Sequence, residues 1–168
     1  SNINIVTDEE KDLILNKFNN TYLEYNHNKT VVDFFEEQVA KNPDNIALVF
    51  KMKAMTYSEL NKKVNSLARY LNNNNIGKGS IVGIIVNRSF EMIVSILAVL
   101  KAGASYIPID PEYPEERICY ILKNSNCDAI LTIQKQAGKV QNLGFEKTII
   151  IADLCNEIIY NLPDNNLN

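Results

Sequence analysis

Hydrophobic and polar positions follow the periods of helices and strands along most of this chain. From Tyr57, apolar residues recur at steps of three and four positions, with lysine, asparagine and arginine between them. This period predicts an amphipathic helix that covers one face of a sheet and ends in the asparagine run at 72–75. Residues 81–86 are continuously apolar and mostly β-branched, which predicts a parallel strand buried on both faces. The segment 90–100 is apolar nearly all round, so we expect an enclosed helix.

Further strands are predicted on both sides of this centre. Residues 46–50 and 53–56 are spaced to pair as a hairpin around a two-residue turn. The runs 129–132 and 147–151 predict two more strands, and Asp153 is placed to cap a short final helix. Strands that alternate with helices in this order predict an α/β fold with a mainly parallel sheet flanked by helices.

Hydroxyl and carboxylate residues mark three helix starts. In a capping box the hydroxyl accepts a hydrogen bond from the third backbone amide, and the carboxylate reaches back. This spacing occurs at Thr7 with Glu10, at Thr30 with Asp33, and at Thr56 with Glu59. The first box predicts a helix over Thr7 to Phe18. Glu59 therefore has a structural role that needs no catalysis.

The stretch 100–117 has the densest pattern of structural signals. Lys101 falls in the last turn of the enclosed helix, where its charge suits the negative end of the helix dipole. Gly103 stands where a left-handed C-terminal cap is needed. Pro108 closes a very short strand, and Pro114 opens the next helix. These signals alone fit any α/β domain.

Composition and charge narrow the function classes. The 168 residues, 46% of them hydrophobic, can build one core. Seventeen basic and twenty acidic residues give a net charge of −3, without a basic block for nucleic acid or anionic lipid. The longest apolar run, 92–100, is far below the ~20 residues of a membrane span. The polar N-terminus is unlike a signal peptide, and we interpret Ser1 and Asn2 as a tag remnant.

Cysteine and histidine usage disfavours a metal site. Cys119, Cys127 and Cys155 lack C-x-x-C spacing, and the chain has one histidine. A zinc site would need an unusual number of carboxylates, so reduced and mostly buried thiols are the preferred interpretation. Such thiols fit a cytoplasmic protein. His27 lies in a polar segment without a serine or cysteine partner, which predicts a surface histidine.

The glycines around Lys78 do not form a phosphate-binding loop. Such a loop needs four residues between its glycines and runs from a strand into a helix. Here a helix precedes Gly77 and a strand follows Gly79. We therefore expect a helix-ending turn at this place. Gly83, inside the central strand, is expected to mark a close packing contact.

Several other polar residues have structural explanations. Arg88 and Glu91 can form a local ion pair at a helix start, and contact with an acyl or nucleotide ligand is the alternative. Tyr57 and Tyr106 are expected to bury their rings and to find a hydroxyl partner. Asp110, which lies between Pro108 and Pro111, is expected to form a turn.

Two stretches resemble core motifs of the adenylation domains of nonribosomal peptide synthetases. Residues 100–110, LKAGASYIPID, resemble the second motif, LKAGxAYxPxD, with Ala104 at the variable position and Ser105 at the small residue. Upstream, residues 55–60, MTYSEL, resemble the first motif, with Met55 replacing its leucine. The sequence of residues 34–48 is similar to that of the family's first helix and strand. Residues 15–25 are similar to the segment that joins a condensation domain to an adenylation domain.

The resemblance implies a fold and a domain division. It extends roughly over 7–161 and is strongest over 31–131. The fold would be the N-terminal portion of the adenylate-forming enzyme fold. Residues 1–29 would be the tag remnant and an interdomain linker with a helix, 30–160 the N-terminal part of an adenylation domain, and 161–168 a truncated linker.

The resemblance also implies an activity for the complete domain. The family converts an amino acid and MgATP to an aminoacyl adenylate and pyrophosphate, then loads the phosphopantetheine thiol of a carrier domain, in secondary metabolite biosynthesis. Its phosphate-binding loop, which ends in proline-lysine-glycine, has no counterpart in the chain. We therefore assign no catalytic, cofactor-binding or metal-binding residue, and expect an inactive scaffold. ATP and Mg belong to the parent enzyme.

The expected partners follow from the same resemblance. They are the remainder of the adenylation domain, an upstream condensation domain and a downstream carrier domain, with neither nucleic acid nor membrane. Bare apolar surface predicts self-association of the isolated chain. We expect the gene to continue into a Ser/Thr/Gly-rich loop. Two alternatives stay open: a fragment of a stand-alone acyl-CoA or aryl-acid ligase, and a non-catalytic interaction module.

Overall fold

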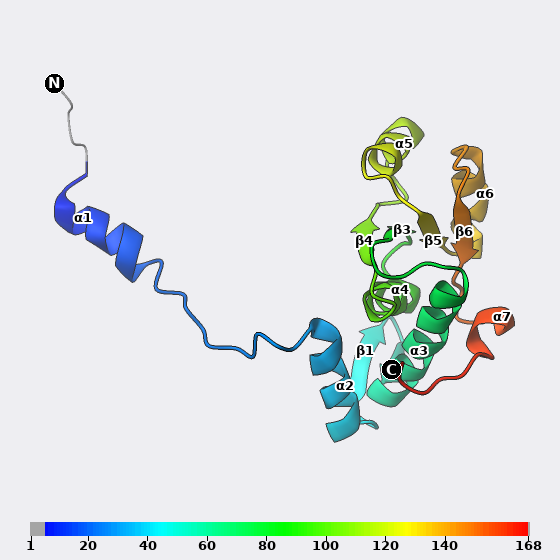
Figure 1. Ribbon diagram of the computed structural model, residues 1–168, viewed down its shortest axis with the longest axis horizontal. Coiled ribbons are helices and arrows are strands. Elements are labelled where there is room, and N and C mark those ends of the chain that lie inside the picture. The colour runs from blue at the N-terminus through cyan, green and yellow to red at the C-terminus, as the bar shows by residue number, and fades with distance from the viewer. Residues whose placement is uncertain (1–5, 168) are drawn as a thin grey trace. The chain divides into compact units, whose positions relative to one another are not determined.

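The computed structural model describes residues 6–167, so the predicted tag remnant, Ser1 and Asn2, lies outside the described residues. The chain divides into two compact units, unit 1 with residues 1–30 and unit 2 with residues 31–168 (Figure 1). Of the helices within residues 6–167, none is long and apolar enough to cross a membrane. Each unit is described by itself below.

Unit 1 contains one helical segment, which starts at the predicted capping box. α1 (Asp8–Asp12) continues into the π-helical stretch η1 (Leu13–Lys17), close to the expected end at Phe18. The Glu10 amide donates to the Thr7 hydroxyl at 3.2 Å, and the Thr7 amide donates to the Glu10 carboxylate at 2.9 Å. These reciprocal bonds confirm the box and satisfy amides that the first helical turn leaves open.

Unit 2 is organised around a four-stranded parallel sheet with the strand order β4-β3-β5-β6. The strands are β3 (Ile81–Ile85), β4 (Ser105–Pro108), β5 (Ala129–Thr132) and β6 (Thr148–Ile151). All three neighbouring pairs are parallel, which confirms the predicted sheet. β3 and β6 are each one residue shorter than the predicted strands.

Helices cover both faces of this sheet (Figure 1). One face packs against α3 (Tyr57–Asn73), α4 (Phe90–Lys101) and α7 (Glu157–Tyr160); the other packs against α5 (Glu115–Asn124) and α6 (Gln134–Asn142). Val82 faces the first layer and Ile85 the second, and they are 0% and 1% exposed. The central strand is therefore buried on both faces, as its apolar run predicts.

α2 (Val31–Lys41) and an antiparallel hairpin complete unit 2. The hairpin joins β1 (Ile46–Phe50) to β2 (Lys53–Thr56), with the predicted bounds and a two-residue turn. It forms a sheet of two strands, separate from the parallel sheet. Val49 on β1 is 70% exposed, and Met52 in the turn is 99% exposed. The hairpin thus presents apolar side chains to solvent.

Local backbone chemistry explains where the elements of unit 2 end. Gly103 has a φ of +83° directly after α4, a conformation that side chains disfavour. Gly79 has a φ of +89° between α3 and β3, and the Ser80 amide donates to the Gly77 carbonyl at 2.9 Å. The predicted glycine cap and the predicted helix-ending turn are both confirmed.

Of two helix starts predicted after β4, one is wrong and one is confirmed. Asn156, not Asp153, caps α7, because its side-chain oxygen accepts a hydrogen bond from the Ile158 amide at 3.1 Å. The loop after β6 instead lies beside the start of α6, where the Asp153 carboxylate accepts from the Gln134 amide at 2.7 Å. Pro114 stands at the N-cap of α5 with Glu115 and Glu116 in the first turn, which confirms the predicted start of that helix.

The three thiols are free but differ in burial. Cys127 is buried, Cys119 is half-buried and Cys155 is exposed. The prediction of mostly buried thiols therefore holds for Cys127 and is wrong for Cys155. Cys155 lies in the loop between β6 and α7.

Candidate functional site

One hollow on the parallel sheet lies at the carboxyl ends of β3 and β4. It has a volume of about 580 Å³ and an apolar floor that includes Ile84, Ile96 and Pro108. Open α/β sheets bind ligands outside the carboxyl ends of their strands, at the point where the strand order reverses. This groove lies at the carboxyl edge of the sheet and reaches Asn87 beside that point, so it is the candidate site.

One wall of the groove is the proline-bounded loop of the 100–117 stretch. Asp110 forms the turn predicted for it, because its carboxylate accepts a hydrogen bond from the Glu112 amide at 2.9 Å. Lys139 of α6 donates to the carbonyls of Pro111 and Tyr113 at 2.5 and 3.0 Å. The loop is thus held by hydrogen bonds between these side chains and its backbone.

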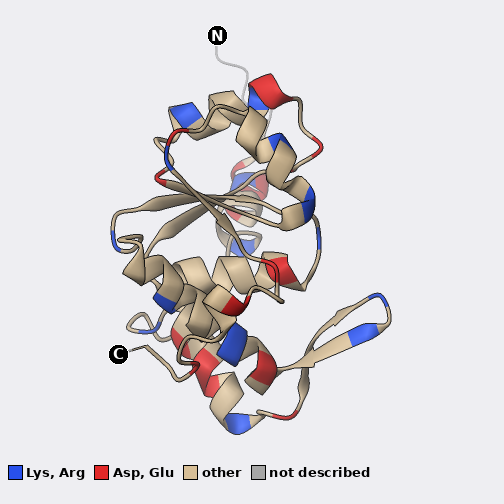
Figure 2. Ribbon diagram, turned by 90° about the vertical axis from the view of Figure 1, so that its right-hand side faces the viewer, with Lys and Arg blue, Asp and Glu red and all other residues tan. Residues whose placement is uncertain are grey.

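The opposite wall comes from the start of α4 and from the hairpin. Arg88, Met92 and Phe50 line it, and the Phe50 ring meets Phe90 edge-on with centroids 6.2 Å apart. Figure 2 shows basic and acidic residues spread along the ribbon, and the residues that line the groove include Arg88 as well as Asp110 and Glu112. The rim accordingly carries both a guanidinium and carboxylates, and its floor is apolar.

The chemistry of the groove suits binding more than reaction. Its described lining contains neither serine, cysteine, histidine nor lysine. Asp110, Glu112 and Tyr113 do line it, but the Asp110 carboxylate already accepts a hydrogen bond within its own loop. Arg88 can attract an anion and the floor can cover an apolar group, but these side chains make no nucleophile-base pair.

The topological switch point lies between β3 and β5, where the chain passes from one face of the sheet to the other. The Gln136 side chain of α6 donates to the Asn87 side-chain oxygen at 2.6 Å and joins the first turn of α6 to the loop after β3. Below it, the Thr132 hydroxyl donates to the Ile85 carbonyl at 2.9 Å. Side chains of the protein itself therefore bridge this crevice.

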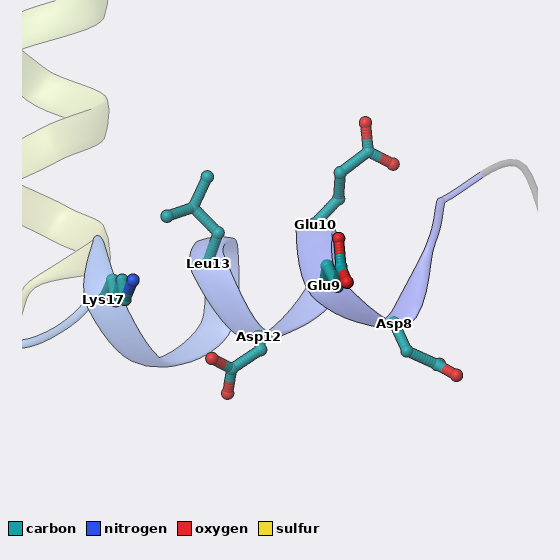
Figure 3. Close-up of a pocket in the computed structure, with 6 residues that line it drawn as sticks. All are labelled: Asp8, Glu9, Glu10, Asp12, Leu13 and Lys17. Carbon is teal, nitrogen blue, oxygen red and sulfur yellow. The ribbon is translucent and has the colours of Figure 1, made fainter.

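A second hollow in unit 1 is lined by one helix alone. Figure 3 shows four carboxylates, Leu13 and Lys17 around α1 and η1, with Glu10 and Leu13 on one side and Asp8 and Asp12 on another. Side chains that point apart cannot share a ligand. Among the described residues, no group of three or more metal-ligating side chains could hold a metal ion.

The polar residues singled out in the sequence have mainly structural contacts. Arg88 and Glu91, both within the described part of the chain, form no ion pair with each other. Tyr57 packs near Phe35 with ring centroids 6.3 Å apart. His27 is exposed and stacks against Tyr25, with ring centroids 4.2 Å apart, as expected of a surface histidine.

The glycine and the tyrosine nearest the sheet have contrasting surroundings. A Cβ atom at Gly83 would lie 3.0 Å from the Leu122 side chain, which confirms the predicted close contact. Tyr106 on β4 is 36% exposed, so its ring is less buried than predicted. The sheet edge explains the difference, because β4 has a neighbour on one side only.

Lys101 has partners that the sequence analysis missed. Its side chain is 3% exposed, and its ammonium pairs with the Glu36 carboxylate of α2 at 2.5 Å. It also donates to the Asn61 and Asn65 side-chain oxygens of α3 at 3.0 and 2.6 Å. Burial lowers the pKa of Lys101, and the hydrogen bond to Glu36 acts in the opposite direction. The helix-end position is as predicted, but the ammonium joins three helices.

No sequence signal links Lys101 to Glu36, which are far apart in the chain and belong to different periodic patterns. The same holds for Lys139 and the carbonyls that it binds. These contacts arise only when the helices pack on the sheet.

Comparison with known families gives a match over most of the chain. A family model described as AMP-binding enzyme matches residues 35–163. Bacitracin synthase 1 of Bacillus licheniformis is 45% identical over 98% of the chain and 3% of its own length. Gramicidin S synthase 1 of Brevibacillus brevis is 44% identical over 84% of the chain and 13% of its own length. The chain thus spans a small part of these relatives.

Solved structures share the fold. The N-terminal subdomain of NpsA from Klebsiella oxytoca is 29% identical, with a TM-score of 0.70, over 83% of this chain and 34% of that one. The AMPPNP-bound form of the nonribosomal peptide synthetase FmoA3 has a TM-score of 0.81 at 22% identity, over 96% of this chain and 17% of that one. The second likeness speaks for the fold alone.

Proposed function

Because the chain belongs to the AMP-binding enzyme family, we propose that it is a scaffold part of an amino-acid-activating adenylation domain of a nonribosomal peptide synthetase. The observation that carries the proposal is where the motif residues lie. Glu59 caps α3, Lys101 joins three helices and Asp110 shapes a loop. Residues of both core motifs are therefore engaged in holding the fold.

The proposed reaction of the complete domain has two steps. An amino acid carboxylate attacks the α-phosphorus of ATP, forms an aminoacyl adenylate and releases pyrophosphate. A phosphopantetheine thiol of a carrier domain then attacks the aminoacyl carbonyl, forms a thioester and releases AMP. The described residues do not fit a Mg²⁺ site, since they contain no cluster of ligating side chains. We therefore route neither step through residues of this chain.

The relatives favour amino acid substrates over the aryl or acyl acids of stand-alone ligases. Bacitracin, mycosubtilin and gramicidin S synthases match at 41–48% identity. A solved neighbour from Klebsiella oxytoca is an artificially fused adenylation-PCP di-domain, 29% identical with a TM-score of 0.71 over 83% of this chain and 25% of that one. Carrier and condensation domains are accordingly the partners we propose for the parent protein.

A segment exchange tests the scaffold assignment. The aligned segment of gramicidin S synthase 1 is replaced by this chain, and amino-acid-dependent ATP-pyrophosphate exchange is measured across the common amino acids. A scaffold leaves the amino acid preference of the recipient unchanged, because the selecting residues lie elsewhere. A chimera that folds but prefers a different amino acid would show that this segment selects the substrate.

We also propose that the isolated chain self-associates through apolar surface. The support is exposure at the hairpin, where Ile46, Val49 and Met52 are 61%, 70% and 99% exposed. Covering such side chains contributes roughly 25 cal/mol for each Å² removed from water.

A further inference from the structure

The last described residues of the chain lie against α3 as a strap, which we define as residues 162–167. Figure 1 shows this C-terminal segment, in red, returning from α7 along α3. Arg69 donates to the carbonyls of Pro163, Asn165 and Asn166 at 3.0, 2.8 and 3.1 Å. Ser66 adds a hydrogen bond to the Leu162 carbonyl at 3.2 Å. The strap is therefore held mainly by donors from α3 to its backbone.

Two buried side-chain amides of α3 make its remaining hydrogen bonds to the strap. Asn65, 0% exposed, donates to the Asp164 carbonyl at 2.7 Å and to the Asn166 side chain at 3.1 Å. Asn61, 9% exposed, donates to the same Asn166 oxygen at 2.9 Å. A side-chain amide has an acceptor end and a donor end, so these contacts require the NH₂ groups to face the strap.

Lys101 determines which way both amides face. An ammonium group is a donor only, so it binds the oxygen ends of Asn61 and Asn65 and leaves their NH₂ ends for the strap. The same ammonium, 3% exposed, needs the Glu36 carboxylate, because a buried charge without a partner is costly. The hydrogen bonds thus run without a break from α2 through Lys101 and α3 to the strap.

We propose that Lys101 couples α2 to the strap, so that the first helix of unit 2 and its last described segment loosen together. The proposal goes beyond the scaffold function, because it assigns a conformational device to one residue. Glu36 shares no hydrogen bond or ion pair with strap residues in the described chain. The hydrogen-bonded route from Glu36 to the strap therefore runs through Lys101 and the two amides.

The coupling is measured by NMR on the ¹⁵N-labelled full chain. Order parameters report strap motion, and amide hydrogen exchange reports the opening of α2. In the Lys101→Met variant we expect strap order parameters to fall from about 0.85 to below about 0.6. Exchange in α2 should accelerate at least roughly threefold, within the range of networked residues.

Reciprocity supplies the decisive comparison, because coupling acts equally in both directions. Arg69→Gln removes strap hydrogen bonds, and it should accelerate exchange in α2 by at least roughly threefold. The Arg69 charge also repels the Lys101 charge. If Arg69→Gln acted only by removing this repulsion, exchange in α2 would become slower. In the Lys101→Met background, Arg69→Gln should add nothing to α2 exchange. Unchanged α2 exchange in Arg69→Gln would overturn the proposal.

A milder variant serves if Lys101→Met does not fold. Glu36→Gln keeps the shape of the side chain on α2, and we expect it to lower the strap order parameters at a distance. The matched control is Lys147→Gln, which breaks the exposed Lys147–Asp128 pair at 3.1 Å and should leave both segments unchanged. Strap order parameters that stay at the wild-type values in Glu36→Gln contradict the coupling.

Discussion

Glu59, in the first core motif, stabilises the start of α3 through reciprocal hydrogen bonds. Its carboxylate accepts from the Thr56 amide at 2.8 Å, and its own amide donates to the Thr56 hydroxyl at 3.2 Å. The Thr56 backbone hydrogen bond lowers the pKa of Glu59 below its ordinary value of 4.5. The ionised carboxylate is thus favoured in the folded state, and its charge also suits the positive end of the helix.

The first prediction concerns the pH dependence of this cap. Because the folded pKa is lowered, the contribution is fully present above the ordinary value and is lost as the pH falls through the folded pKa. Glu59→Gln should therefore lower the melting temperature at neutral pH, and the difference should shrink as the pH falls through the lowered pKa. Circular dichroism melts measure it. Glu10→Gln, in the similar box of unit 1, should leave the unit 2 transition unchanged. A difference that persists in acid would exclude the charged cap.

The second prediction concerns Gly83 in β3. A Cβ atom there would meet the Leu122 side chain at 3.0 Å and the Cys127 sulfur at 3.5 Å. Gly83→Ala should lower the free energy of unfolding by about 1–3 kcal/mol, because the core is overpacked. Urea titration measures it. At Gly138 in α6, a Cβ atom meets nothing within 4 Å, so Gly138→Ala should raise stability by about 0.5–1 kcal/mol. Equal effects at both glycines would contradict the packing argument.

At the scale of elements, the hairpin differs from the parallel sheet in having two strands only. A two-stranded hairpin is marginally stable by itself and needs a surface to pack on. α3 and α4 supply part of that surface, through contacts that include Phe50 with Phe90. Val49 and Met52 are directed away from this support, which leaves an apolar edge of the kind that pairs with other chains.

The third prediction is that this edge drives self-association. The molar mass from light scattering should rise with concentration for the wild-type chain. Val49→Lys with Met52→Lys should shift the mass toward the monomer, because a charge on an edge strand opposes pairing. Ile158→Lys on α7, where the isoleucine is 74% exposed, is the matched control and should have no effect. A strictly monomeric wild-type chain at high concentration would refute the role of the hairpin.

At the scale of the whole molecule, most of the polar side chains described above hold loops and helices in place. Lys139 of α6 holds the loop that forms one wall of the groove at the carboxyl ends of β3 and β4, and the switch point carries the Asn87–Gln136 hydrogen bond. Gly77 and Gly79 form a turn that runs from helix to strand. This is the reverse of the context in which glycine-rich loops bind phosphate.

The fourth prediction is that the 168-residue chain neither binds ATP tightly nor catalyses amino-acid-dependent ATP-pyrophosphate exchange. Charge neutralisation at phosphate needs a cation or a cradle of backbone amides, and the described residues offer neither in a suitable arrangement. Calorimetric titration with MgATP, together with exchange assays across the common amino acids, measures it. Saturable micromolar binding would overturn the scaffold assignment.

Local signals in the sequence were sufficient for the elements whose energies are local. The two capping boxes at Thr7 and Thr56 and the stop at Gly103 depend on residues within four positions of one another, and the hairpin strands pair residues no more than ten positions apart. The spacing of apolar residues was sufficient to predict that β3 is buried and that helices flank it. Residues that recur at the period of a helix or strand lie on one face, and an apolar face is the one that becomes buried. The two core motifs in the sequence were sufficient to predict the family.

Contacts between distant segments were decided only by the tertiary structure. Asp153 caps α6 instead of α7 because parallel pairing of β5 with β6 brings their following loops together. Lys101 meets Glu36 because α2 packs across the ends of α3 and α4, and the strap reaches α3 only after α7 has turned the chain back. A helix dipole can be inferred from position along one element, whereas the partner of a buried charge depends on which elements become neighbours.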